Sequence, residues 1–209
     1  EELDKATGDD ITRVLEQYTT PDYYWRGMHP FYEQRGSKDV ADVFWKPFRH
    51  AFTSIQRRPD VFMAGLNEID GFQSEWVCSM GHLMGLFDRD WLGIPSTGKM
   101  GFLRYVEFNR ITDGKISETA FFCDVLSVMY QAGLNPLPTS TGAFFITPGP
   151  RTHDGLLFAK SDPVDSKKTL DLINRMIQDL GSAKNMHSDQ DELARTWHRD
   201  MIWFGPAGI

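Results

Sequence analysis

A series of strand-like segments separated by turn residues occupies the middle of this 209-residue sequence and limits its folds most. The clearest turn is Asp113-Gly114, a dipeptide typical of tight β-hairpins. The strand-like segments are Asp60–Asn67, Ser74–Phe87, Lys99–Ile111 and Lys115–Leu126. Short connections favour antiparallel neighbours, so these segments predict a run of antiparallel strands.

Two segments before these strands have helical periodicity. Residues 9–19 begin with Asp9 or Asp10 as an N-cap, and Ser37 caps a second helix that extends to Phe52, with Pro47 as a kink site. Helices followed by strands predict an α+β fold, a cone of curved antiparallel sheet packed against N-terminal helices. Helices against one face of such a sheet would leave a cone-shaped cavity.

Three regions are predicted along the chain. Residues 1–137 form the first domain, residues 138–188 form an extended connection rich in Pro and Gly with a linker helix, and residues 189–209 open a truncated second domain. The second domain is inferred from four identities at a constant offset of 178 residues. They pair Leu15, Asp22, Trp25 and Gly27 with Leu193, Asp200, Trp203 and Gly205. A coincidental helix followed by Trp and Gly is the alternative.

Charge and composition exclude several classes of function. The net charge is −7, and no run of five like charges exists, which argues against a nucleic-acid surface. With no signal peptide and no apolar run of transmembrane length, we expect a cytoplasmic protein without membrane contact. Cys78 and Cys123 are predicted to be buried free thiols on strands, with a strand-to-strand disulfide as the alternative. No spacing of His or Cys suggests a metal site.

Several short motifs occur together in a specific order. They are Phe-Met-Ala-Gly (62–65), Gly-His-Leu-Met-Gly (81–85), Gly-Ile-Pro-Ser-Thr-Gly-Lys (93–99), Glu-Phe-Asn-Arg-Ile (107–111), Asp-Gly-Lys-Ile-Ser-Glu (113–118) and Gln-Ala-Gly (131–133), with Asp124 between the last two. Over roughly residues 8–137 the chain thereby resembles the SnoaL-like polyketide (ester) cyclases of the NTF2-like superfamily. The resemblance implies a cone-shaped, often dimeric fold. It also implies an intramolecular aldol condensation on a polyketide ester without metal, cofactor or Schiff base.

The resemblance assigns two catalytic residues. Asp124 holds the position of the family's acid/base, and His82 is the nearest match to a pocket histidine. Two departures lie beside the expected pocket: Ala120 stands where the family usually has Trp, and residues 88–91 lengthen the loop before Gly93. Apart from the resemblance, Asp124 is also explained as a strand-end residue that caps the following turn, and His82 as a core histidine.

The substrate-binding candidates depend on strand register. His82 shares an ideal strand face with Trp76 and Met80. If a two-residue turn pairs Thr112 with Lys115, then Leu103, Tyr105 and Glu107 share the face of Asp124; a three-residue loop with a bulge substitutes Arg104, Val106 and Phe108. Both turns suit the sequence. The candidates are therefore Trp76, Met80, Arg104, Tyr105, Glu107 and Phe122.

Two classes of function follow. The first is a cofactor-free cyclase that performs acid/base chemistry on a hydrophobic, carbonyl-bearing small molecule, or a dehydratase or isomerase on the same fold. The second is a non-catalytic NTF2-like module that binds a ligand or a protein. We expect a homodimer or an intramolecular pairing of tandem domains. A closed apolar pocket that contains both Asp124 and His82 would favour the enzyme.

Overall fold

The computed structural model describes residues 2–138, 149–150, 152–181 and 194–201. Two compact units are distinguished, one that extends to Phe158 and one that begins at Ala159. In the second unit, α6 (Pro163–Gly181) is the helix predicted for the linker region. Leu193, Trp203 and Gly205 of the predicted repeat lie outside the described residues.

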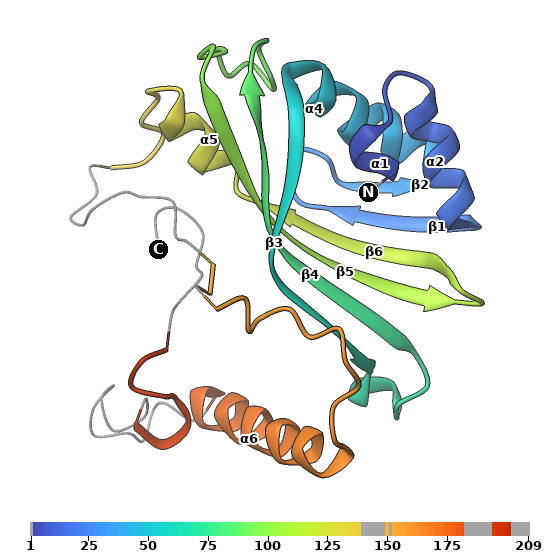
Figure 1. The fold of residues 1–209 in the computed structure, drawn as a ribbon, viewed down its shortest axis with the longest axis vertical. Helices are drawn as coiled ribbons and strands as arrows, with labels where there is room; N and C mark the ends of the chain where they lie inside the picture. Colours follow the sequence, from blue (N-terminus) through green and yellow to red (C-terminus); the bar gives the residue numbers. More distant parts are fainter. Residues whose placement is uncertain (1, 139–148, 151, 182–193, 202–209) are drawn as a thin grey trace. The chain divides into compact units, whose positions relative to one another are not determined.

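The first unit is built on a curved six-stranded sheet with the N-terminal helices packed against one side (Figure 1). The strand order is β2-β1-β6-β5-β4-β3. The strands are β1 (Thr19–Gly27), β2 (Glu33–Arg35), β3 (Phe52–Leu66), β4 (Glu75–Phe87), β5 (Met100–Thr112) and β6 (Lys115–Cys123). The helical segments are α1 (Glu2–Lys5), α2 (Asp10–Tyr18), α3 (Ser37–Val40), the π-helical η1 (Ala41–Trp45), α4 (Lys46–Ala51), the 3-10 turn η2 (Glu68–Asp70) and α5 (Val125–Gln131).

The α+β fold class is confirmed, with one difference in the sheet. β1 pairs with β6 in parallel, whereas the sequence predicted antiparallel strands throughout and no strand over residues 19–27. Pro21 was interpreted as the end of the preceding helix, and residues 22–36 as an aromatic, turn-rich segment. In the structure, the β1–β6 register is interrupted between Thr19 and Tyr24, which accommodates Pro21.

The helix predicted from Ser37 to Phe52 is present as a continuous helical segment. Its middle part, η1, has the wider π-helical turn, and Pro47 follows in the first turn of α4. The wider π-helical turn immediately precedes Pro47, at the point where proline removes one helical N–H donor. The helix therefore passes Pro47 without ending.

Two β-bulges bend β3, and a glycine of β4 lies opposite each of them. The register shifts between Thr53 and Gln56 and again between Pro59 and Val61. A Cβ added to Gly85 would lie 2.8 Å from the Thr53 carbonyl oxygen, and one added to Gly81 would lie 2.1 Å from the Arg58 carbonyl oxygen. The two glycines of the 81–85 motif thus allow the close backbone approach that the bent sheet requires.

An aromatic core joins the helices to the sheet. Phe44 packs face to face with Phe48 at 5.6 Å between ring centroids, and Phe52 stacks on Phe87 at 4.4 Å. Trp91, in the loop that lengthens the segment before Gly93, is 2% exposed and contacts Phe48 at 5.3 Å. The added loop residues therefore contribute a core aromatic side chain as well as length.

Candidate active site

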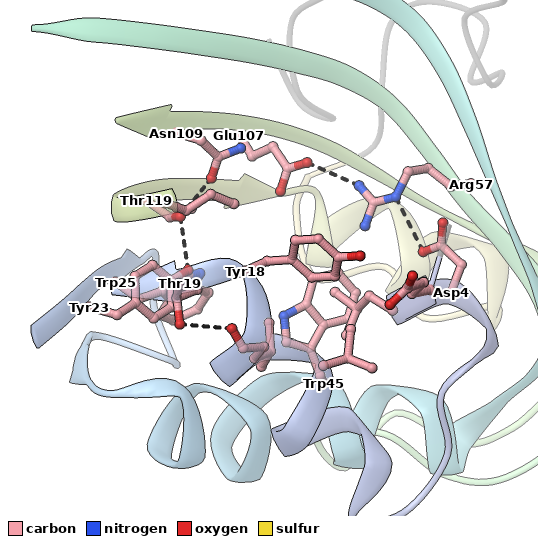
Figure 2. A pocket seen from close by; sticks show the side chains of 15 residues that line it. Asp4, Tyr18, Thr19, Tyr23, Trp25, Trp45, Arg57, Glu107, Asn109 and Thr119 are labelled. Atoms are coloured by element: carbon pink, nitrogen blue, oxygen red, sulfur yellow. Dashed lines mark hydrogen bonds and ion pairs between the residues drawn. The ribbon is translucent and has the colours of Figure 1, made fainter. Parts of the chain in front are cut away.

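A cavity of about 510 Å³ lies between the sheet and the N-terminal helices (Figure 2). It combines aromatic walls with a small number of polar groups, which is the usual composition of small-molecule sites. The lining residues come from α1, α2, η1 and four strands. They are Glu2, Leu3, Asp4, Val14, Leu15, Tyr18, Thr19, Tyr23, Trp25, Trp45, Arg57, Glu107, Asn109, Ile116 and Thr119.

A charged group of three residues forms one part of this cavity. The Arg57 guanidinium donates to Glu107 Oε1 over 3.1 Å and to Asp4 Oδ1 over 3.3 Å. The same guanidinium lies over the rings of Tyr105, at 4.9 Å, and Trp45, at 5.6 Å. Arg57 therefore connects α1 to the middle of the sheet, as Figure 2 shows.

Burial controls the titration of this group. The side chain of Glu107 is 17% exposed, and burial raises the pKa of its carboxyl, although Arg57 opposes that shift. For Arg57, burial acts against the charge, but Glu107, Tyr105 and Asp4 outweigh it and raise the pKa of the guanidinium. A carboxyl with a raised pKa beside a permanent cation can exchange a proton while the cation holds a negative oxygen.

A hydrogen-bond chain forms a second polar region of the cavity. The Tyr23 hydroxyl donates to Thr119 Oγ1 over 2.8 Å, and the Thr119 hydroxyl donates to Asn109 Oδ1 over 2.6 Å (Figure 2). Burial raises the pKa of Tyr23, which keeps its hydroxyl protonated as a donor. Because Asn109 accepts through its oxygen, its amide hydrogens are the groups that it can offer to a ligand.

The structure decides which residues of β5 share each face. The turn pairs Thr112 with Lys115, as in the first alternative. The pairing of β5 with β6 then shifts by one residue, because Ser117 of β6 lies opposite no residue of β5. Beyond this bulge Tyr105 pairs with Cys123 and Glu107 pairs with Phe121 across the two strands. Arg104 is therefore the residue of β5 that lies opposite Asp124. The bulge thus gives the face assignment of the second alternative with the turn of the first.

The predicted substrate-binding residues divide between the two faces of the sheet. Glu107 lines the cavity, and Tyr105, on the same face, stacks with Arg57. The even-numbered residues of β5 point to the face opposite the one with Tyr105 and Glu107. Four predicted residues lie on that opposite face, because each is an even-numbered residue of β5 or pairs with one. They are Trp76, Met80, Arg104 and Phe122.

His82 and Asp124 are neighbours of Arg104 and are not part of the cavity lining. His82 pairs directly with Arg104 across β4 and β5, and its Nδ1 lies 3.2 Å from Asp60 Oδ2. Burial lowers the pKa of His82, while Asp60 opposes the shift. The Asp124 N–H donates to the Arg104 carbonyl, and Asp124 Oδ1 accepts from Ser127 N over 2.9 Å. Asp124 therefore caps α5, the role that the sequence gave as its structural alternative.

The polar cavity residues that were missed from the sequence include Asp4, Arg57, Asn109 and Thr119. Arg57 was missed because Pro59 suggested a strand start at Asp60, whereas β3 begins at Phe52. Alternate residues of a strand point to the same face, so Asn109 shares the face of Glu107. The same rule could have placed Thr119 on that face if the bulge at Ser117 had been known.

Within the described ranges, no group of His, Cys, Asp and Glu could hold a metal ion. Cys78 and Cys123 are free thiols, and burial raises the pKa of Cys78 to about 11 and that of Cys123 to about 12. Of the helices in the described part of the chain, none is long and apolar enough to span a membrane.

An α+β sheet with a helix-covered cavity defines the NTF2-like class of fold. Residues 7–132 match the family model described as SnoaL-like polyketide cyclase, so the chain belongs to this family. No curated protein matches the sequence significantly.

Solved structures share the fold at low sequence identity. IdmH from Streptomyces antibioticus, a candidate polyketide cyclase, superposes with a TM-score of 0.50 at 16% identity and covers 64% of this chain and 94% of its own. AclR from Streptomyces galilaeus, a candidate hydroxylase, gives a TM-score of 0.50 at 19% identity and covers 66% of this chain and 92% of its own. These neighbours have different named activities, so they support the fold and do not choose a reaction.

Proposed function

We propose that this protein is a cofactor-free cyclase that performs acid/base chemistry on a hydrophobic, carbonyl-bearing small molecule. One observation carries the proposal: Glu107, a carboxyl with a raised pKa, is ion-paired with Arg57 inside an aromatic cavity of about 510 Å³. Trp25, Trp45 and Tyr23 provide flat apolar surface for the substrate.

The aldol reaction requires a base and a group that holds negative oxygen. Ionised Glu107 removes a proton from the carbon beside a carbonyl, and Arg57 stabilises the enolate oxygen. The enolate carbon then attacks a second carbonyl of the same molecule, which forms the new carbon–carbon bond. The resulting alkoxide takes the proton from the Glu107 carboxylic acid, and the carboxylate is regenerated.

This assignment differs from the one implied by the resemblance. Asp124 and His82 would be the acid/base pair by position in the family pattern, but Asp124 accepts the Ser127 N–H at the start of α5. The positions of Glu107 and Arg57 in the cavity lining support the alternative pair. The two assignments predict different effects of substituting Glu107 and Asp124 on the same reaction.

A non-catalytic binding module is the second candidate. Arg57 already contacts Asp4 as well as Glu107, so the charge of Arg57 is paired without a ligand. Such a network could serve only to position a bound molecule. A dehydratase or isomerase would use the same proton transfers as the cyclase and would differ in substrate.

The test separates binding from proton transfer. A panel of aromatic β-ketoesters is titrated against tryptophan fluorescence, and exchange of the substrate α-proton with deuterated solvent is followed by NMR. We expect Glu107→Gln to retain binding and to lower the exchange rate by about 100-fold or more, the usual contribution of a positioned base. Asp124→Asn, which retains an oxygen for the Ser127 N–H, should exchange like the unsubstituted protein.

Three other outcomes would reject the assignment. Loss of exchange in Asp124→Asn with normal exchange in Glu107→Gln would return the acid/base role to Asp124. Tight binding without any exchange would identify the protein as a binding module. Exchange that neither substitution alters would show that neither carboxylate is the base.

A further inference from the structure

A second cavity, of about 490 Å³, lies between the start of α2, the end of α4 and the first residues of β3. It shares no lining residue with the candidate active site. We propose that this basic cavity binds an anionic group, a phosphate or a carboxylate, of a small molecule. Its lining residues are Thr7, Gly8, Asp9, Ile11, Lys46, Arg49, His50, Phe52, Thr53, Ser54 and Arg89.

The charge of the basic cavity is opposite to that of the chain. Lys46, Arg49 and Arg89 contribute three positive charges, and Asp9 is the acid among the lining residues, whereas the whole protein has a net charge of −7. Lys46 is partly neutralised, since its ammonium lies 2.8 Å from Asp42 and 3.3 Å from Asp9. The two arginines supply the remaining positive charge.

Arg49 is the residue that most requires a partner. Its Nε is buried and has no hydrogen-bond partner among the described residues. Burial lowers the pKa of its guanidinium, and the negative charge of Asp4 only partly offsets that effect. A buried guanidinium nitrogen without an acceptor is unfavourable, and a bound anion would supply acceptor oxygens together with a counter-charge.

Arg89 is held at the same cavity by the backbone. One of its terminal nitrogens donates to the His50 carbonyl over 3.0 Å, which fixes the guanidinium beside the end of α4. The adjacent Asp88 is engaged by the Thr53 hydroxyl. Two arginines from separate segments therefore converge on one cavity, and their planar donors suit the oxygens of phosphate and carboxylate groups.

The experiment uses inorganic phosphate as the probe. Binding to the full chain is measured by titration calorimetry at constant ionic strength, with sodium chloride as the balancing salt, and acetate is titrated in parallel. We expect saturable binding, and we expect Arg49→Gln/Arg89→Gln to weaken it at least about tenfold because two charge-assisted contacts are lost. Arg35→Gln removes the same type of charge from an exposed site on β2 and is the matched control.

The outcomes separate the ligand sources and the structural explanation. Saturable phosphate binding that is lost in the double variant supports a phosphate site, and the same pattern with acetate alone supports a carboxylate site. If the double variant does not fold, Arg89→Gln, whose side chain is exposed, should still weaken binding severalfold. The proposal is overturned if neither anion binds saturably, or if binding is unchanged in the variants, or if Arg35→Gln weakens it equally.

Discussion

Replacement of Gly81 by alanine tests how the bent sheet positions the candidate active site. An added Cβ would lie 2.1 Å from the Arg58 carbonyl oxygen and 2.9 Å from the Pro59 Cα. Ordinary van der Waals contact begins at 3.4 Å, so β3 and β4 must separate by more than 1 Å at this point. Both opposing atoms belong to the backbone and cannot rotate away.

The expected cost is large because no side chain can relieve the contact. Overpacking in a well-packed region costs about 1–3 kcal/mol, and we expect about 3 kcal/mol of lost unfolding free energy for Gly81→Ala. That loss corresponds to a decrease in Tm of roughly 10 °C for a unit of this size. Since Arg57 is adjacent to the contact, the ion pair with Glu107 should weaken and ligand affinity should fall.

Urea unfolding followed by tryptophan fluorescence measures this change, because Trp25, Trp45 and Trp91 are buried in the same unit. Gly65→Ala is the matched control: Gly65 lies on β3, and a Cβ there would meet no atom within 4 Å. We expect the control to change stability by less than about 0.5 kcal/mol. If Gly81→Ala is no more destabilising than Gly65→Ala, the argument from close strand approach is incorrect.

Three further predictions concern single residues. Asp124→Ala should lower the unfolding free energy by about 1 kcal/mol through loss of the α5 cap, and Asp124→Asn should lower it less; equal losses in denaturant titrations would contradict the capping role. Leu103→Ala, at a site with 0% exposure, should cost about 2–5 kcal/mol, while Leu66→Ala, at 60% exposure, should have little effect on Tm. The pKa of His82 is lowered below its ordinary 6.5, so its contribution to stability is present above that pH and is lost as the pH falls through the folded-state pKa. The unfolding free energy of His82→Asn should therefore be less sensitive to acid as the pH falls below 6.5, and an unchanged pH dependence of unfolding would exclude His82 as the cause.

The sequence was sufficient to predict the central part of the fold. Turn residues and alternation identified β4, β5 and β6 because hairpin geometry depends on local backbone preferences. Helical periodicity likewise identified α2 and the helix that begins at Ser37. The predicted caps were less accurate, because Gly36 and not Ser37 is the N-cap of α3, and the Asp9 side chain makes no capping hydrogen bond. β1 was not predicted because Pro21 interrupts the local signal, and its parallel pairing with β6 joins segments about ninety residues apart.

The candidate site depended on the tertiary structure to a greater extent. Glu107 and Tyr105 were among the predicted binding residues, but the sequence left open whether they or Arg104 shared a face with Asp124. One unpaired residue, Ser117, decides this point, because a shift of one position exchanges the two faces of every residue beyond it. Alternation can therefore group residues into two sets, but it cannot assign either set to the cavity.

By itself the sequence determined the strand segments of β4, β5 and β6, the hairpin at Asp113-Gly114 and the family to which residues 7–132 belong. These features depend on neighbours in the chain or on motif order. The tertiary structure alone brought Asp4 of α1 to Arg57 of β3 and Glu107 of β5. The physical reason is that ion pairing and burial depend on distances between segments that are remote in sequence, and these distances are set by the bulges that bend the sheet.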